Sequence, residues 1–235
     1  MRYALNLTEH TTIDSAKRSI PRWNATELDL SYNTLSTKQP NDILTLLGSI
    51  PASISTLNLT QTGLGQINNS SLIELLQTIP AHINTLILTQ NGLGSCNKTD
   101  EELCAIFSAI SNHTSIHALG LACNDLGTRD NPEIFNALRV NTVNLRHNHL
   151  ERLSPQTFVA ILHNHHTVHI GNHEFTPEQL HAMAAGNIDT LEHLDLRASR
   201  LDRHPEALRA LISSLPALKT LGLADNELGR LEKIT

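Results

Sequence analysis

One motif recurs along most of this chain and limits what the chain can fold into. It has the form LxLxxNxL, with other apolar residues in some Leu positions and other polar residues in some Asn positions. Successive copies start 24 to 33 residues apart, at Leu28, Leu57, Leu86, Leu119, Val143, Val168, Leu194 and Leu221. A repeat on this scale predicts a solenoid, in which each unit packs mainly against its two neighbours.

The start of each unit predicts a short strand. In one unit, Leu57 and Leu59 flank Asn58. Because successive side chains of a strand point to opposite faces, both leucines enter the core while Asn58 faces the other side. The same alternation in every unit predicts a parallel sheet with one apolar face and one exposed face.

An asparagine follows the strand in most units, at Asn33, Asn91, Asn124, Asn148 and Asn226. Its side-chain amide both donates and accepts hydrogen bonds, so it can satisfy buried backbone groups where the chain leaves the sheet. Thr62, His173 and Ser199 take this place in three units. We expect the ladder of asparagines to be interrupted at these three residues.

A helix is predicted to return the chain from one strand to the next. Capping-box patterns predict helix starts at Ser71, Thr99 and Thr176, and a proline at the first helical position predicts starts at Pro132, Pro155, Pro177 and Pro205. Apolar residues follow at helical spacing, such as Leu72, Leu75, Leu76 and Ile79. Most periods exceed 24 residues, which favours a full helix over a tight extended or 3₁₀ segment.

These features identify the units as leucine-rich repeats, and their sequences resemble repeats of the ribonuclease-inhibitor type. The predicted fold class is an α/β solenoid, or horseshoe, with a parallel sheet on its concave side and helices on its convex side. We expect a single domain over residues 1–235. Residues 1–27 would form a degenerate N-terminal unit or cap, with a motif copy starting at Leu5, and residues 28–235 would form eight repeats.

The amino-acid sequence of the repeats resembles that of one group of proteins. The segments IPASISTLNLTQTGLG (50–65) and IPAHINTLILTQNGLG (79–94), joined by SLIELLQTIP (71–80), resemble leucine-rich-repeat effectors of Legionella. The resemblance implies a protein that a type IV secretion system injects into host cells. Relatives with an F-box module or a catalytic ubiquitin-ligase domain carry segments that this sequence is not expected to contain, so the resemblance transfers no catalytic residue.

Composition excludes several other classes. Lys and Arg number 17 against 23 Asp and Glu, for a net charge of −6, and no basic stripe suggests a nucleic-acid partner. No apolar run is long enough to span a membrane, and the N-terminus does not have the pattern of a signal peptide. We therefore expect synthesis and folding in the cytoplasm, followed by transfer to the host cytosol if the protein is an effector.

The exposed strand positions define a candidate binding face. Its first half is nearly uncharged, whereas its second half gathers charged and imidazole side chains, Glu192 among them. The candidate partner-binding residues on this concave face are Tyr32, Asn58, Asn144, Arg146, His147, His169, His193, Asp195 and Arg197. Aromatic residues are only 3% of the chain, so Arg, His and Asn must supply most of the affinity for a protein partner. The alternative is that these charged side chains only keep the exposed face of the sheet hydrated and form cross-strand pairs, without binding a partner.

Histidine and cysteine raise the question of metal or catalytic chemistry. Twelve of the 14 histidines lie between His113 and His204, including the run from His163 to His169. No metal site or cofactor is predicted, because a zinc site needs three or four converging ligands and these residues need not share a face. Cys123 and His147 fall on adjacent units, but an open sheet offers no evident oxyanion site.

The predicted function is a non-enzymatic protein-protein interaction module, acting as a bacterial effector on a host protein through the concave face. Three alternatives stay open. They are a cytosolic ribonuclease-inhibitor-like binding protein, a GTPase-regulator-like binding protein, and a metal-dependent enzyme that uses the histidine-rich second half. Self-association through an under-capped end of the solenoid is a further expectation.

Overall fold

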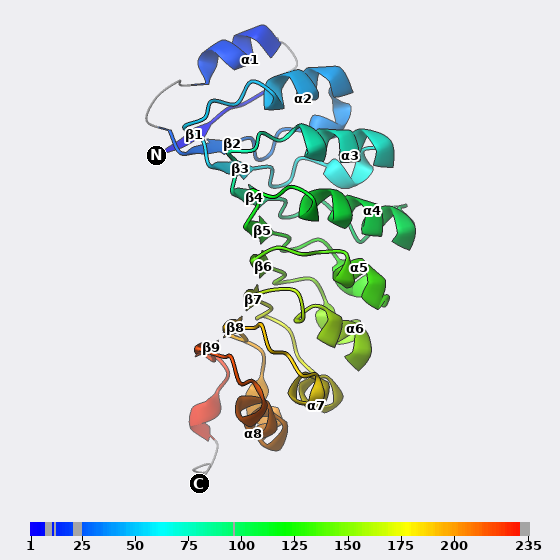
Figure 1. The fold of residues 1–235 in the computed structure, drawn as a ribbon, viewed down its shortest axis with the longest axis vertical. Coiled ribbons are helices and arrows are strands. Elements are labelled where there is room, and N and C mark those ends of the chain that lie inside the picture. Colours follow the sequence, from blue (N-terminus) through cyan, green and yellow to red (C-terminus); the bar gives the residue numbers. More distant parts are fainter. Residues whose placement is uncertain (8–10, 12, 21–24, 96, 231–235) are drawn as a thin grey trace.

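The computed structural model describes residues 1–7, 11, 13–20, 25–95 and 97–230. In these ranges nine strands form one sheet in chain order, with every neighbouring pair parallel. They are β1 (Arg2–Ala4), β2 (Glu27–Asp29), β3 (Thr56–Asn58), β4 (Thr85–Ile87), β5 (Ala118–Gly120), β6 (Thr142–Asn144), β7 (Thr167–His169), β8 (His193–Asp195) and β9 (Thr220–Gly222). Figure 1 shows them stacked along the inner side of an open curve, with the helices outside. The predicted fold class is confirmed.

Helices line the convex side of this sheet. They are α1 (Ile13–Ser19), α2 (Pro40–Leu47), α3 (Asn69–Thr78), α4 (Asp100–Ser111), α5 (Pro132–Asn136), α6 (Pro155–Ala160), α7 (Pro177–Ala185) and α8 (Pro205–Ser214). The capping boxes at Thr99 and Thr176 form as predicted, and all four predicted prolines occupy the first helical position. No helix in the described ranges has the length and hydrophobicity needed to cross a bilayer.

The predicted start of α3 is wrong. Asn68 caps the helix instead of Ser71, and its Oδ1 accepts a hydrogen bond from the Ser71 N–H at 2.9 Å. Asparagine is as good an N-cap as serine, so the cap three residues earlier gives a longer helix.

The predicted helices form, but the expectation that they replace a 3₁₀ segment is wrong, because most units contain both. Short 3₁₀ turns lie at Leu35–Thr37, Leu64–Gln66, Leu126–Thr128, Leu150–Arg152, Leu201–Arg203 and Leu228–Arg230. In the first five, the opening leucine is fully buried. The tight turn keeps that leucine in the core immediately after the strand. The helices that follow differ in length, from 5 residues in α5 to 10 in α3 and α8.

The N-terminal unit is shifted by two residues from the predicted register. Tyr3, and not Leu5, pairs with Leu28. Leu5 therefore occupies the second leucine position, where its carbonyl accepts a hydrogen bond from Asn33 Nδ2 at 2.8 Å. Apolar residues alternate at Tyr3, Leu5 and Leu7, so the motif can be placed in two registers that differ by two residues. Only pairing with β2 distinguishes these registers. Asn6, expected on the exposed face of the strand, lies beyond its end.

The core is a lattice of stacked aliphatic side chains. Leu28, Leu57, Leu86, Leu119 and Val143 are each buried at the same place in the successive strands β2 to β6. All four phenylalanines are buried with them, between sheet and helices, so none is left for the surface. Parts of the predicted N-terminal unit, including Thr8, Glu9, Pro21 and Trp23, lie outside the described residues, as do Cys96 and residues 231–235 of the last predicted repeat.

The ladder of asparagines continues through one of the three predicted interruptions. Asn148 Nδ2 donates to the Leu121 carbonyl at 2.9 Å, and its Oδ1 accepts from the Leu126 N–H at 3.2 Å. The imidazole of His173 makes the same two bonds one unit later, from Nε2 to the Leu145 carbonyl at 3.4 Å and to Nδ1 from the Leu150 N–H at 3.3 Å.

A neutral imidazole has one donor and one acceptor nitrogen, so it can replace a side-chain amide. Burial lowers the pKa of His173, which favours this neutral form. The hydroxyls of Thr62 and Ser199 bond instead to carbonyls of their own units.

Candidate functional site

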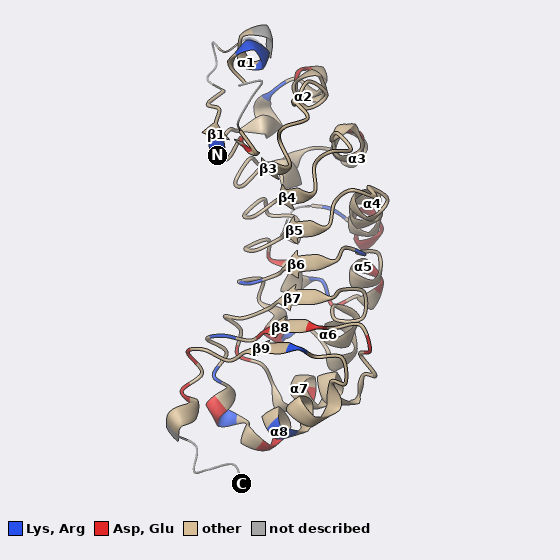
Figure 2. Cartoon of the chain, turned by 60° about the vertical axis from the view of Figure 1, so that its left-hand side comes forward, with Lys and Arg blue, Asp and Glu red and all other residues tan. Residues whose placement is uncertain are grey.

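The concave face is built from side chains held in register by the sheet. One row between the two leucines runs from strand to strand through Asp29, Asn58, Ile87, Gly120, Asn144, His169, Asp195 and Gly222. Neighbours in such a row stand ~4.8 Å apart. Strands β3, β4 and β5 carry no charged residue and are drawn tan in Figure 2.

The outermost row of the face is a turn and not part of the strands. Eight residues occupy it, all with φ between 51° and 67°: Tyr32, Gln61, Gln90, Cys123, His147, Asn172, Ala198 and Asp225. This is the left-handed region, which non-glycine residues rarely adopt. The strands end after three residues because the chain must turn here to bring the next leucine back into the core.

Polar side chains at the third and last position of a strand have a structural role that sequence analysis missed. Oδ1 of Asn58 accepts a hydrogen bond from the Thr60 N–H at 3.0 Å, and Oδ1 of Asn144 accepts from the Arg146 N–H at 3.2 Å. Asn58 is only 8% exposed. This predicted contact residue therefore supports the turn and offers little surface to a partner.

Three of the predicted residues meet at Asp195, on β8. Arg146 Nη2 donates to Asp195 Oδ2, and Arg197 Nε donates to both carboxylate oxygens at 3.0 and 3.1 Å. His169 Nδ1 lies 3.4 Å from the same Oδ2. The Arg197 backbone N–H also donates to Oδ1, at 3.1 Å. We call Arg146, His169, Asp195 and Arg197 the arginine cluster.

The carboxylate at the centre of this cluster stays ionised. Its side chain is only 10% exposed, and this burial opposes ionisation. The hydrogen bonds from the Arg197 N–H, the Arg197 side chain and Arg146 outweigh that cost and lower the Asp195 pKa to about 2. At neutral pH the cluster is therefore a fixed arrangement of two guanidinium groups around one carboxylate.

A smaller ionic group lies at the N-terminal end of the same face. Arg2 Nε donates to Asp29 Oδ2 at 2.9 Å and also lies 3.5 Å from Glu27 Oε1. Tyr32 stands beside this group and is 72% exposed. Tyr32 follows β2, so of the other predicted residues only Asn58, on β3, lies near it; the rest start on β6, four strands away along the sheet.

His193 and His147 flank the arginine cluster without joining it. His193 Nδ1 lies 2.6 Å from Thr220 Oγ1, and its Nε2 lies 3.9 Å from Glu192 Oε2. Lys219 Nζ forms an ion pair with Glu192 at 2.9 Å. His147 is exposed, in the turn row next to Arg146.

The histidine run does not assemble into one site. His165 is buried and hydrogen bonded through Nδ1 to the Val140 carbonyl at 2.7 Å, whereas His163 and His166 are exposed. Burial lowers the pKa of His165 to about 4. Within the described ranges no three His, Cys, Asp or Glu side chains are placed to hold a metal ion.

Cys123 shows no sign of an activated thiol. Burial, together with the nearby Asp125, raises its pKa, whereas a nucleophilic cysteine needs a lowered one. Burial, with the nearby Asp100, likewise raises the pKa of Cys104, which packs against the core. Both thiols behave as small, partly buried fillers.

Sequence analysis missed Arg2 and Lys219 as members of the ionic groups on this face. It also missed two glycines, Gly171 and Gly222, that make room for the arginine cluster. A Cβ atom on Gly171 would lie 2.9 Å from Arg197 Cγ, and one on Gly222 would lie 2.9 Å from Asp195 Oδ1. Both glycines fall in the concave-face rows of the repeat alignment beside an arginine or an aspartate of the neighbouring unit, which is the signal that could have revealed them.

Comparison with known proteins agrees with this fold. A family model described as "Leucine Rich Repeat" matches residues 24–46. The crystal structure of the leucine-rich repeat-containing protein LegL7 from Legionella pneumophila is similar, with a TM-score of 0.82 and 28% identity over 96% of this chain and 73% of that one.

A distant likeness is to a chain in the crystal structure of a TLR13-ssRNA13 complex, with a TM-score of 0.35 and 14% identity over 94% of this chain and 42% of that one. No curated protein matches. The chain thus has the leucine-rich-repeat fold and resembles a leucine-rich-repeat protein of Legionella.

Proposed function

We propose that this chain is a non-enzymatic module that binds a protein partner through its concave face. The arginine cluster is the observation that supports this proposal most strongly. It places two arginines on an open surface, around a buried carboxylate that fixes their geometry. Solenoids commonly bind through such extended concave surfaces, and arginine is one of the residues enriched among strong interface contacts.

A finer proposal concerns where the module acts. The resemblance of residues 50–94 to effector repeats, together with the similarity to a Legionella protein, supports a bacterial effector that is secreted and binds a host protein in the host cytosol. The partner would then be present in eukaryotic cells. This origin of the partner determines which lysate should be used to test the proposal.

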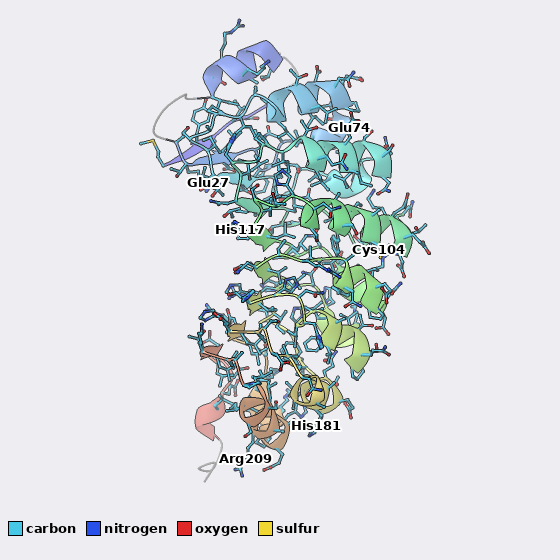
Figure 3. All side chains as sticks on the ribbon, viewed as in Figure 1. Glu27, Glu74, Cys104, His117, His181 and Arg209 are labelled. Carbon is cyan, nitrogen blue, oxygen red and sulfur yellow. The ribbon has the colours of Figure 1, made fainter. Side chains whose placement is uncertain are left out.

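The test is affinity capture from eukaryotic lysate with the wild-type chain and two triple variants. One variant replaces Arg146, His169 and Arg197 by Gln on the concave face. Its matched control replaces Arg139, His181 and Arg209 by Gln, which removes the same residue types from exposed positions outside that face. His181 and Arg209 are labelled on α7 and α8 in Figure 3.

The proposal predicts that wild type and control capture the same protein and that the concave variant loses it. Far-UV circular dichroism must show that both variants remain folded. If the folded concave variant captures the same protein as wild type, the partner binds elsewhere and the proposed site is wrong.

A further inference from the structure

We infer that the arginine cluster recognises an acidic segment of the partner, through carboxylates of its Asp or Glu residues. This inference rests on the proposed function and adds the chemistry of the partner. It starts from the hydrogen-bond capacity that the cluster leaves unused. An arginine side chain has five N–H donors, and Asp195 uses only part of those available.

Arg197 provides most of the unused donors. Its side chain is 50% exposed, and its Nε is bonded to Asp195. Among the described residues neither Nη1 nor Nη2 of Arg197 has a hydrogen-bond partner. These two nitrogens form the outer edge of the guanidinium, which is suited to bidentate binding of a carboxylate.

Arg146 is held more deeply in the same cluster. Its side chain is 24% exposed, and Nη2 is bonded to Asp195. Its Nε is buried and has no hydrogen-bond partner within the described chain. The positive charge of Arg146 is therefore only partly satisfied by Asp195, which it shares with Arg197.

The charge on this part of the face favours an acidic ligand. In the strand rows of the last four units, two arginines face one aspartate, so one positive charge is left over. Glu192 does not cancel that charge, because it is paired with Lys219. Asp225, in the turn row of the same face, is a second carboxylate, so the excess of positive charge is confined to the strand rows. The chain as a whole carries a charge of −6, so even this confined excess runs against the overall sign.

The surface beside the cluster has room for a side chain. A shallow hollow of about 250 Å³ is lined by His169, His193, Asp195, Arg197, Thr220 and Gly222. Gly171, between Arg146 and Arg197 on the intervening unit, leaves room for Arg197, whose Cγ would lie 2.9 Å from a Cβ at that position. A carboxylate entering this hollow would meet the free edge of Arg197.

The same observations disfavour a nucleic acid. A polyanion gains affinity from many phosphate contacts, whereas this face offers two fixed cations on a chain that is negative overall. A short acidic peptide segment needs only one or two such contacts. Asp195 positions the arginines and cannot itself be the binding group, because it is an anion that accepts all of its hydrogen bonds from the cluster.

Three labelled probes test the inference with the full chain by fluorescence anisotropy. They are hexaglutamate, hexaglutamine and a short single-stranded oligonucleotide of the same charge as hexaglutamate. We expect hexaglutamate to bind at least about tenfold more tightly than the other two, and its affinity to fall with added salt.

Two variants locate this binding. Arg146→Gln with Arg197→Gln should weaken hexaglutamate binding about tenfold or more, whereas Arg139→Gln with Arg209→Gln should leave it unchanged. Arg197→Gln alone is the second test of the cluster, because it keeps Asp195 paired with Arg146 and so preserves the fold. It should weaken binding by several-fold.

The inference is overturned if hexaglutamate binds no better than hexaglutamine, if the oligonucleotide binds as tightly, or if affinity survives in the folded cluster variants. The capture experiment above is independent of the probes. If the concave variant loses the captured protein but hexaglutamate does not bind, only the inference about acidic chemistry fails. If capture is unaffected by the concave variant, the proposed function fails as well.

Discussion

Acidification should destabilise this solenoid through one buried histidine. The imidazole of His165 is 1% exposed, and its Nδ1–H donates to the Val140 carbonyl. Burial and the neighbouring His166 oppose protonation, and the pKa of His165 falls from 6.5 to about 4. The unfolded chain therefore takes up a proton at a higher pH than the folded chain does.

The size of the effect follows from this difference. Stabilisation by neutral His165 is complete above about pH 6.5 and is lost as the pH falls toward 4. The free energy of unfolding should drop by about 2 kcal/mol between about pH 7 and pH 5, and by about 3 kcal/mol at about pH 4. Domains are commonly stable by only about 5–15 kcal/mol, so this loss is easily measured.

Urea unfolding followed by far-UV circular dichroism, at several pH values, measures the effect. His165→Gln should flatten the pH dependence of the unfolding free energy, whatever it does to stability at neutral pH. His163→Gln is the matched control, because His163 is exposed two residues away in the same run. The reasoning is refuted if His165→Gln is destabilised by acid as steeply as wild type, or if the control flattens the curve equally.

Three further predictions concern stability. His173→Ala leaves a buried N–H and a buried carbonyl unpaired and should cost about 2 kcal/mol, whereas His173→Asn restores the amide and should cost less, as urea unfolding can show. Gly127→Ala places a Cβ 1.9 Å from the His149 carbonyl oxygen and should lower the free energy of unfolding by about 1–3 kcal/mol in the same assay. Gly229→Ala is its control, because a Cβ there has nothing within 4 Å, and it should change that free energy by less than about 0.5 kcal/mol. Asp195→Asn should cost about 1–2 kcal/mol near neutral pH, after allowance for solvent screening at this open face. Because the folded-state pKa is lowered, the Asp195 contribution is present above about pH 4 and is lost as the pH falls toward 2, so wild type and variant should converge there; equal differences at all pH values would contradict the assignment.

The sheet could be predicted from sequence because two simple periods determine it. Alternation of leucines fixes which side chains face the core, and the recurrence of the motif fixes which residues of neighbouring strands are partners. For example, the predicted pairing of Asn144, His169 and Asp195 is the observed one. The N-terminal unit was misplaced because residues 3–7 offer apolar residues in two registers with the same face inward.

Features that depend on conformation or side-chain reach were not predictable in this way. The turn row has a left-handed backbone, but Tyr32, Cys123, His147 and Ala198 give no glycine signal for it. The arginine cluster joins residues two strands apart, so it depends on the length of the Arg146 side chain and not on adjacent pairing.

The role of His173 was missed for a related reason. The sequence alone does not indicate that the imidazole of His173 is neutral and forms hydrogen bonds as an amide does. That property follows from burial, which is known only once the neighbouring units are in place.

The one-to-one register of the strands has a consequence for how proteins of this kind can diversify. Duplication of a whole unit lengthens a solenoid without disturbing its core, because each unit is a complete module. A duplication between β6 and β8 would nevertheless move Arg146 a further ~4.8 Å from Asp195 and dissolve the arginine cluster. Insertions elsewhere would leave it intact. Repeat number can therefore change freely outside this short stretch, whereas inheritance of the arginine cluster requires three consecutive units to stay together.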